Sequence, residues 1–240
     1  MIQENKSISA IVPFYNEEKY IKDSVNRLIK TEIFNQIILV NDSSQDGSRN
    51  IASELSEKHQ SIILVDSSEN KGKGNAINLA IPYLQTTHVV VHDADLEYFP
   101  EDIVEMFQAA IENPSALILG SRCIGNKERK NLYKITYYGN KILTKIFSIL
   151  NNYSVTDIAS CYWLIEVEKL KKLNIKEKGF SIEVEVLSKY LKLGHNIIEV
   201  PIKYEGRSYE DGKKINYLDG IKIFIKILLY SKFMSFFVKN

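Results

Sequence analysis

Several residue types that define other protein classes are scarce in this chain of 240 residues. Its two cysteines, Cys123 and Cys161, have neither disulfide density nor metal-site spacing, so we expect a reducing compartment. Eleven glycines and five prolines are too few for a collagen-like chain. No run reaches the ~18 uncharged apolar residues of a membrane span, and the N-terminus contains no signal-peptide core. With 45% hydrophobic residues, the chain can instead build one large folded domain.

The net charge is also small, at +1, and by itself predicts no polyanion binder. The total conceals an asymmetry, because residues 1–120 carry 9 basic and 18 acidic groups whereas residues 121–240 carry 22 and 12. Such a division suggests that the second half meets an anionic partner, most simply phosphate, nucleic acid or a membrane surface. The alternative is that the two signs mix in space once the chain has folded.

Apolar runs of strand length alternate with amphipathic stretches of helix length, which is the pattern of a mainly parallel α/β sheet flanked by helices. The expected strands are 8–15, 36–40, 62–66, 88–93, 116–121 and 197–204. The expected helices are 17–31, 47–59, 74–85, 101–112, 133–150 and 181–193. Because ligands bind beyond the carboxyl ends of such strands, the polar residues that follow each strand are the first candidates for a site.

Asp93 ends the strand expected at 88–93, and Asp95 lies two residues further on. Residues two apart in an extended chain face the same way, so both carboxylates can point into one space. Two adjacent carboxylates repel each other unless a cation lies between them, and hard oxygen ligands suit Mg²⁺ or Mn²⁺. We therefore predict a divalent metal site that also holds a diphosphate.

The segment KGKG at 71–74 leads into an expected helix, where glycines permit close backbone approach and lysines favour anions. It matches neither the Walker A loop nor the dinucleotide-binding glycine pattern. This argues against a P-loop nucleotidase and against a dinucleotide oxidoreductase. An ordinary turn that contains glycine is the alternative.

The order and spacing of five segments resemble those of family 2 glycosyltransferases. These segments are VPFYNEE (12–18), VNDSSQDGS (40–48), NKGKGNA (70–76), DADL (93–96) and GSR (120–122). Later segments resemble the dolichyl- or polyprenyl-phosphate hexose synthases of that family. These are TDIASCYW (156–163), GF (179–180) with Glu183 and Glu185, EVPI (199–202) and RSYEDGKK (207–214).

This resemblance implies a GT-A type nucleotide-sugar-binding fold and inverting transfer of a hexose from a nucleoside diphosphate sugar (GDP-mannose or UDP-glucose type) to a polyprenyl or dolichyl phosphate. The donor pocket would be lined by Pro13, Tyr15, Glu17, Asp42, Lys73 and Asp93. Asp93 and Asp95 would hold Mg²⁺ or Mn²⁺, with Asp95 essential for transfer. Arg122, Lys134 and Arg207 would contact phosphate, and Asp157 would lie beside the reacting sugar. Two departures from the family pattern are Asn41, where many members have aspartate, and Trp163, where relatives often have a basic residue.

The residues leave several roles open. A phosphate monoester is already anionic and mainly needs positioning by arginine, so Asp157 could act as a base, orient the sugar or merely cap a helix at 158–165. Glu183 and Glu185 could approach the acceptor or lie on a solvated helix face. The rival functions are a family 2 enzyme that adds sugar to a glycan hydroxyl, a sugar nucleotidyltransferase and a non-catalytic binding protein.

We divide the chain into a catalytic domain, 1–218, and a C-terminal basic amphipathic helix, 219–240. A helix there would place Lys222, Lys226, Lys232 and Lys239 on one side, with isoleucine, leucine and phenylalanine elsewhere. Such a helix can lie in a membrane interface or pack on the domain. We expect a peripheral enzyme at the cytoplasmic face of a membrane that does not bind nucleic acid, with a separate membrane protein as a further partner.

Overall fold

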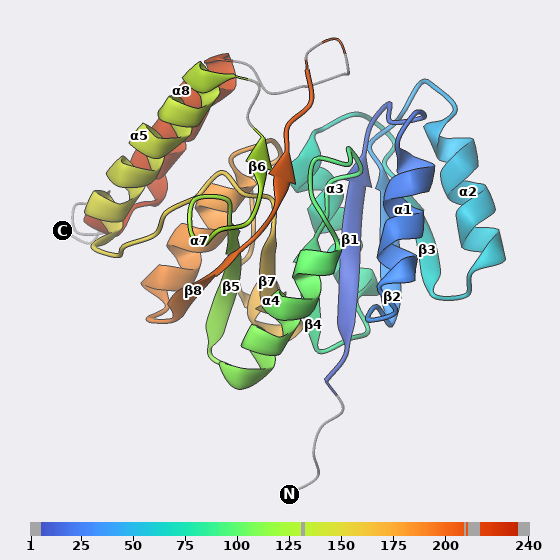
Figure 1. Ribbon diagram of the computed structural model, residues 1–240, viewed down its shortest axis with the longest axis horizontal. Coiled ribbons are helices and arrows are strands. Elements are labelled where there is room, and N and C mark those ends of the chain that lie inside the picture. Colours follow the sequence, from blue (N-terminus) through green and yellow to red (C-terminus); the bar gives the residue numbers. More distant parts are fainter. Residues whose placement is uncertain (1–5, 131–132, 209, 211–216, 235–240) are drawn as a thin grey trace, which may run out of the picture.

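The computed structural model describes residues 6–130, 133–208, 210 and 217–234. Within these residues, seven strands form one sheet in the order β3-β2-β1-β4-β7-β5-β8 (Figure 1). The strands are β1 (Ile8–Phe14), β2 (Gln36–Asn41), β3 (Ile62–Asp66), β4 (His88–Val91), β5 (Ala116–Ser121), β7 (Trp163–Glu166) and β8 (Asn196–Pro201). The expected class, a mainly parallel α/β sheet, is confirmed.

Helices cover both faces of this sheet, because the strands are apolar on both faces. One face packs against α1 (Ile21–Lys30), α2 (Ser48–Lys58) and α4 (Glu101–Glu112). The other packs against α3 (Lys73–Ala80), α5 (Lys134–Asn151), α6 (Val167–Lys172) and α7 (Ile182–Lys192). Successive strand residues point to opposite faces of the sheet. In β1, Ala10 and Val12 pack on the face covered by α1, α2 and α4, and Ile11 packs on the face covered by α3, α5, α6 and α7.

The strand β7 was not predicted. It runs antiparallel between β4 and β5, where Val90 pairs with Leu164 and Ile118 pairs with the same residue from the other side. Three of its four residues, 163–165, fall within the helix at 158–165 that the sequence left open as an alternative, because a short apolar run has no periodicity that separates strand from helix. The interpretation of Asp157 as the N-cap of that helix is therefore wrong.

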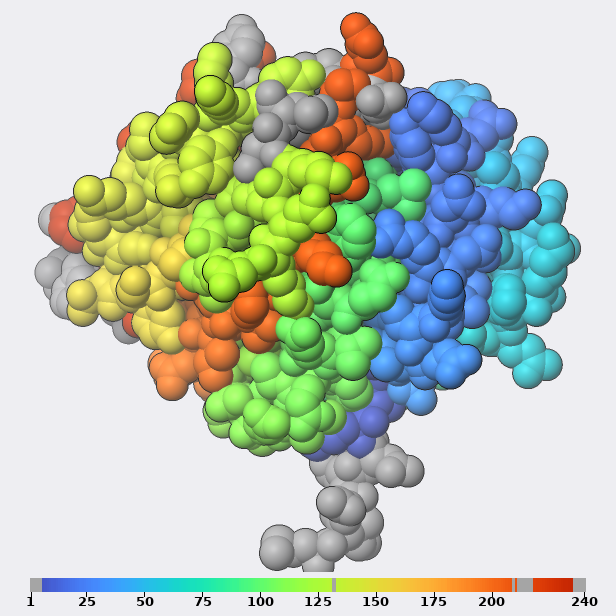
Figure 2. Space-filling view, in the orientation of Figure 1, coloured from blue at the N-terminus to red at the C-terminus, as the bar shows by residue number. Residues whose placement is uncertain are grey.

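The expected strand 197–204 is divided in the structure. β8 ends at Pro201, and the chain then forms β9 (Tyr204–Glu205), which pairs in parallel with β6 (Arg129–Lys130) in a separate two-stranded sheet. The backbone N–H of Lys203 donates to Asp102 instead of continuing the ladder. Figure 2 shows the orange chain around β9 between the lime 121–130 region and the blue N-terminal part. This places β9 beside the strand ends.

The helix α8 (Tyr217–Tyr230) lies alongside α5, apart from the sheet (Figure 1). Ile227 is buried, and Lys226 forms an ion pair with Glu177 at 2.7 Å, so one side of α8 packs on the domain. Lys239, which completes the predicted lysine arc, lies outside the described residues. In the part of the chain that the structure describes, no helix combines the length and the hydropathy needed to cross a bilayer.

Candidate active site

A cavity of about 430 Å³ lies at the carboxyl ends of β1, β2 and β4, and residues of α3, α5, α7 and α8 also line it. Nine of the eleven predicted site residues line it. They are Pro13, Tyr15, Glu17, Asp42, Lys73, Asp93, Asp95, Arg122 and Arg207. The two that do not are Asp157, which lies behind Arg122, and Lys134, which is exposed at the first residue of α5. The polar strand ends thus converge as the sheet topology predicts.

The segment after β4 brings three carboxylates to one side of the cavity. Asp93, Asp95 and Glu97 alternate along the chain, and the backbone N–H of Glu97 donates to Asp95 at 3.1 Å. Burial, together with the neighbouring charges of Glu97 and Asp93, raises the pKa of Asp95 to about 7. This corner of the cavity therefore holds more negative charge than its own basic residues offset.

Lys73 lies between two carboxylates from distant parts of the chain. Its Nζ is 2.8 Å from Asp93 Oδ1 and 2.9 Å from Glu183 Oε1. Burial alone would raise the pKa of Asp93, but the Lys73 ammonium outweighs it and lowers that pKa. Burial raises the pKa of Glu183. Lys73 thereby joins α3 to both the end of β4 and the first turn of α7.

The loop before α3 is fixed by Asp42. The Asp42 carboxylate accepts the backbone N–H groups of Lys71 at 3.1 Å and Gly72 at 2.7 Å. Gly72 has φ of +95°, and a Cβ there would lie 2.7 Å from the Lys178 carbonyl oxygen. A Cβ at Gly74 would overlap the Glu177 carbonyl oxygen. Both glycines are thus needed for the loop to pass close to the 176–179 backbone, which places Lys73 in the cavity.

Arg207 follows β9 and reaches across the cavity mouth to the N-terminal half. Its Nη1 is 2.9 Å from Glu17 Oε2, and its Nη2 is 3.2 Å from Glu17 Oε1 and 3.5 Å from Asp95 Oδ2. The Arg207 backbone N–H also donates to Glu97, which accepts a second hydrogen bond from the Tyr204 hydroxyl. Arg207, predicted to bind phosphate, is therefore held by the acidic residues Glu17, Asp95 and Glu97 in this structure.

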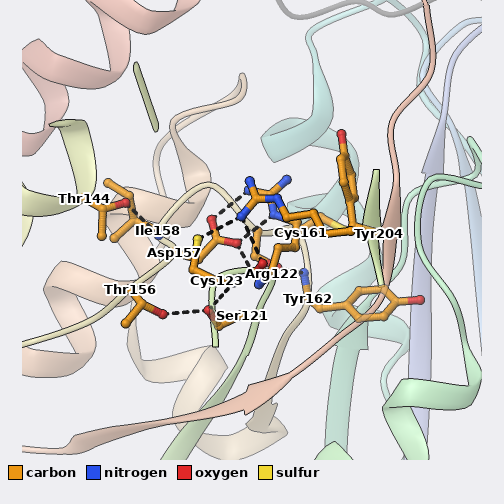
Figure 3. A network of polar contacts seen from close by, with 12 residues as sticks. Ser121, Arg122, Cys123, Thr144, Thr156, Asp157, Ile158, Cys161, Tyr162 and Tyr204 are labelled. Atoms are coloured by element: carbon orange, nitrogen blue, oxygen red, sulfur yellow. Dashed lines mark hydrogen bonds and ion pairs between the residues drawn. The ribbon is translucent and has the colours of Figure 1, made fainter. Parts of the chain in front are cut away.

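Arg122 and Asp157 form a buried ion pair (Figure 3). Arg122 Nε donates to Asp157 Oδ2 and Arg122 Nη2 donates to Oδ1, both at 2.7 Å. Arg122 Nη1 donates to the Tyr98 hydroxyl at 3.0 Å, and the guanidinium lies over the Tyr204 ring. Burial opposes ionisation of Asp157, but the charge of Arg122 outweighs it and lowers the pKa of Asp157. The pair is thus permanently charged at neutral pH and fixes the guanidinium against the cavity.

The two predicted metal ligands, Asp93 and Asp95, both line the cavity. In the described residues, no group of three or more histidine, cysteine, aspartate or glutamate side chains could enclose a metal ion. Mg²⁺ is typically held by one or two carboxylates together with substrate phosphates and water, which is the set that Asp93, Asp95 and a bound diphosphate would provide. The uncompensated charge at Asp95 fits a cation there as well.

The cavity lining also contains apolar side chains from the helices and from the segments before β7 and α7, namely Leu143, Ile158, Ala159, Phe180, Val184 and Ile223, together with the polar Thr136 and Asn140 of α5. On the outer side of the same helices, α5 and α8 expose large apolar side chains, and Ile135 at 89% exposure is the extreme case. The others are Tyr138, Ile142, Ile149, Leu218, Ile221, Phe224, Ile225, Leu228 and Leu229. We call this set the α5–α8 surface.

Several residues in and near the cavity were missed or left open by the sequence. Glu183 is buried rather than solvated, and Glu185 is fully buried, where it accepts the backbone N–H groups of Lys176 and Glu177. Glu97 continues the alternation of Asp93 and Asp95, a signal that was available in the sequence. Tyr98 and Tyr204 carried no such signal, because their role depends on the position of Arg122.

Comparisons with known proteins agree with this arrangement. The model of the family "Glycosyl transferase family 2" matches residues 9–173. A UDP-N-acetylglucosamine–dolichyl-phosphate N-acetylglucosaminyltransferase of Methanococcus voltae is 33% identical over 94% of this chain and 96% of the relative. A dolichol-phosphate mannosyltransferase of Pyrococcus furiosus is 28% identical over 87% of this chain and 60% of its own length.

Solved structures show the same fold. Glucosyl-3-phosphoglycerate synthase from Mycobacterium tuberculosis, in complex with Mn²⁺, UDP-glucose and phosphoglyceric acid, superimposes with a TM-score of 0.73 at 16% identity. The match covers 94% of this chain and 80% of that one. The fold is therefore of the GT-A type, as the sequence resemblance predicted, and the chain belongs to glycosyl transferase family 2.

Proposed function

We propose that this glycosyltransferase moves a single sugar, a hexose or an N-acetylated hexose, from a nucleoside diphosphate donor to a polyprenyl or dolichyl phosphate. The observation that carries the proposal is the mixed lining of the cavity, which combines Asp93, Asp95 and Arg122 with apolar side chains of the surrounding helices and loops. A lipid phosphate likewise combines a charged head with an apolar chain.

The chemistry of that acceptor agrees with the basic groups present. A phosphate monoester is anionic at neutral pH, so it attacks the sugar without a general base and needs charge compensation and orientation. Arg122 faces the cavity with a guanidinium that Asp157, Tyr98 and Tyr204 hold in place. We assign Arg122 to the acceptor phosphate and Asp157 to the positioning of Arg122. Lys134 would meet the phosphate only at the entrance, since it does not line the cavity.

On the donor side, Pro13, Tyr15, Glu17 and Asp42 would surround the nucleoside, as the family resemblance implies. Asp93 and Asp95 would hold Mg²⁺ or Mn²⁺, which would offset the charge that develops on the departing diphosphate. The synthase of similar fold binds Mn²⁺ with UDP-glucose, and Mg²⁺ with UDP, which supports this assignment. Lys73, fixed by Asp93 and Glu183, would add a cation close to the same diphosphate.

We also propose that the enzyme works at a membrane surface, because its acceptor is a lipid. The α5–α8 surface supports this: α5 contains no acidic residue, and Lys134, Lys141 and Lys145 are exposed among its apolar side chains. Apolar residues interleaved with lysine favour an anionic lipid interface. The inner side of the same two helices lines the cavity, so a docked enzyme would present the cavity to the lipid layer.

The second candidate is transfer to a glycan hydroxyl, which needs a general base near the acceptor. Asp157 is a poor base because Arg122 occupies both of its oxygens and lowers its pKa. The test is to incubate the protein with Mn²⁺, dolichyl phosphate and either radiolabelled UDP-N-acetylglucosamine or GDP-mannose. Label in a charged, solvent-extractable lipid supports the proposal. Label that enters only a water-soluble glycan, when oligosaccharides are added, overturns it.

A further inference from the structure

Arg207 contacts three acidic side chains of the donor side. It binds Glu17 bidentately, lies 3.5 Å from Asp95 and has its Nε 3.9 Å from Glu97. Its side chain is only 10% exposed, and those of Glu17 and Glu97 are similarly buried. Three carboxylates this close together would repel one another strongly without a positive partner. Arg207 is thus a counter-ion for the acidic corner of the cavity.

Asp93 has a counter-ion of its own in Lys73, which is also held by Glu183. Lys73 and Arg207 therefore place two positive charges against Asp93 and Asp95, the pair proposed to hold the metal. A divalent cation carries the same charge. The chain itself thus supplies part of the positive charge that Mg²⁺ or Mn²⁺ would bring to this place.

A divalent cation held by Asp95 would repel the Arg207 guanidinium, which lies 3.5 Å from the same carboxylate. Lys73 pairs with Asp93 and Glu183, so the basic residue that contacts Asp95 is Arg207. We therefore expect metal binding to weaken the contact between Arg207 and Asp95, while Glu17 still holds Arg207 bidentately.

We propose that Arg207 is an internal counter-ion that competes with the divalent metal for Asp95, and that metal binding breaks the contact between Arg207 and Asp95. This inference rests on the proposed metal role of Asp95. Arg207 stabilises the acidic corner when no metal is bound, and the same contact weakens the apparent affinity for the metal.

The test is a titration with Mn²⁺ alone, in which free Mn²⁺ is followed by electron paramagnetic resonance. The proteins are the wild type, Arg207→Gln, Asp95→Asn and Arg49→Gln. Arg49 is the matched control because it also forms a bidentate pair with a carboxylate, Asp66, but lies outside the cavity. We expect Arg207→Gln to bind Mn²⁺ about tenfold more tightly, the order expected for loss of one competing charged contact, and Arg49→Gln to match the wild type.

Thermal unfolding gives a second reading on the same proteins. Without metal, Arg207→Gln should be less stable than the wild type, and Mn²⁺ should stabilise it by a larger shift. Unchanged or weaker Mn²⁺ binding by Arg207→Gln, or equal tightening in Arg49→Gln, overturns the competition. Full Mn²⁺ binding by Asp95→Asn would instead contradict the metal site on which the inference rests, so the two failures are distinguishable.

Discussion

Arg122, at the end of β5, and Asp157, before β7, form a buried bidentate ion pair that joins two segments 35 residues apart. Neither charge can be removed alone without leaving the other buried and unpaired. A charge left in that state costs about 3–5 kcal/mol, and replacement of both partners by apolar residues costs much less.

We therefore expect Asp157→Leu and Arg122→Met to lower the free energy of unfolding by several kcal/mol each. The double variant with the same two substitutions should cost less than the sum of the single changes. Urea denaturation of the two single variants and the double variant measures this coupling. Additive losses would mean that the pair contributes no interaction of its own.

Asp95→Asn should reduce sugar transfer by about a hundredfold or more, because it removes a charge from the proposed metal and diphosphate site. The fold should persist, since no strand or helix depends on the Asp95 side chain. Initial rates with saturating donor, and the thermal midpoint without metal, separate the two effects. Retained turnover in a folded variant would contradict the assignment of Asp95.

Gly72→Ala should lower the free energy of unfolding by about 1–2 kcal/mol, because alanine must adopt φ of +95° and its Cβ meets the Lys178 carbonyl. Donor affinity should fall as well, since the loop positions Lys73. Gly139→Ala in α5 is the control, as a Cβ there meets nothing within 4 Å. That change should be neutral or stabilising. Equal effects of the two substitutions would refute the role given to the loop.

His92 should make stability depend on pH. Burial lowers its pKa to about 3, and its ring hydrogen-bonds Ser24 and Tyr162, so His92 is neutral in the folded protein. His92 takes up a proton near pH 6.5 in the unfolded chain. The contribution of the neutral, buried ring to the free energy of unfolding is therefore complete above pH 6.5 and is lost as the pH falls toward 3. Denaturation of wild type and His92→Gln at pH 7.5 and 5 should show the shallower pH dependence in the variant. Parallel curves would exclude this contribution.

The α5–α8 surface predicts lipid binding. Changing Ile135, Ile142 and Ile149 of α5 to serine should weaken co-sedimentation with anionic vesicles by about tenfold or more, because exposed apolar area is removed. Serine at Val104 and Ile111, two exposed apolar residues of α4, is the matched control. High salt should weaken binding of the wild type. Equal binding by both variants would show that α5 does not face the lipid.

The cavity residues were largely predictable because parallel strands deliver their carboxyl ends to one edge. Pro13, Asp42, Asp93 and Asp95 needed only that rule and the family motifs. Other features depend on contacts between distant segments. Nothing local distinguishes the buried Glu183 from a solvated glutamate, since its partner Lys73 is 110 residues away in the sequence. The insertion of β7 was hidden for the same reason, because its antiparallel place is set by β4 and β5.

The positions of the basic residues were also only partly predictable from the sequence. The basic second half suggested an anionic partner, yet Arg122 and Arg207 each contact an acidic residue in the structure. The lysines of α5, in contrast, are exposed among apolar side chains. Some basic residues of the second half are thus paired with acidic residues inside the fold, and others are exposed on the α5–α8 surface.

The most direct measurement of the central claim compares two acceptors that differ by one phosphate. Dolichyl phosphate and dolichol are each incubated with the enzyme, Mn²⁺ and either UDP-N-acetylglucosamine or GDP-mannose, and the lipid products are identified by mass spectrometry. We predict a phosphodiester-linked monosaccharide from dolichyl phosphate and no product from dolichol, because Arg122 orients an anionic nucleophile and Asp157, the carboxylate beside it, is held by Arg122 and is a poor base for a hydroxyl. Equal transfer to dolichol, or transfer to neither lipid while a glycan is elongated, would contradict the account.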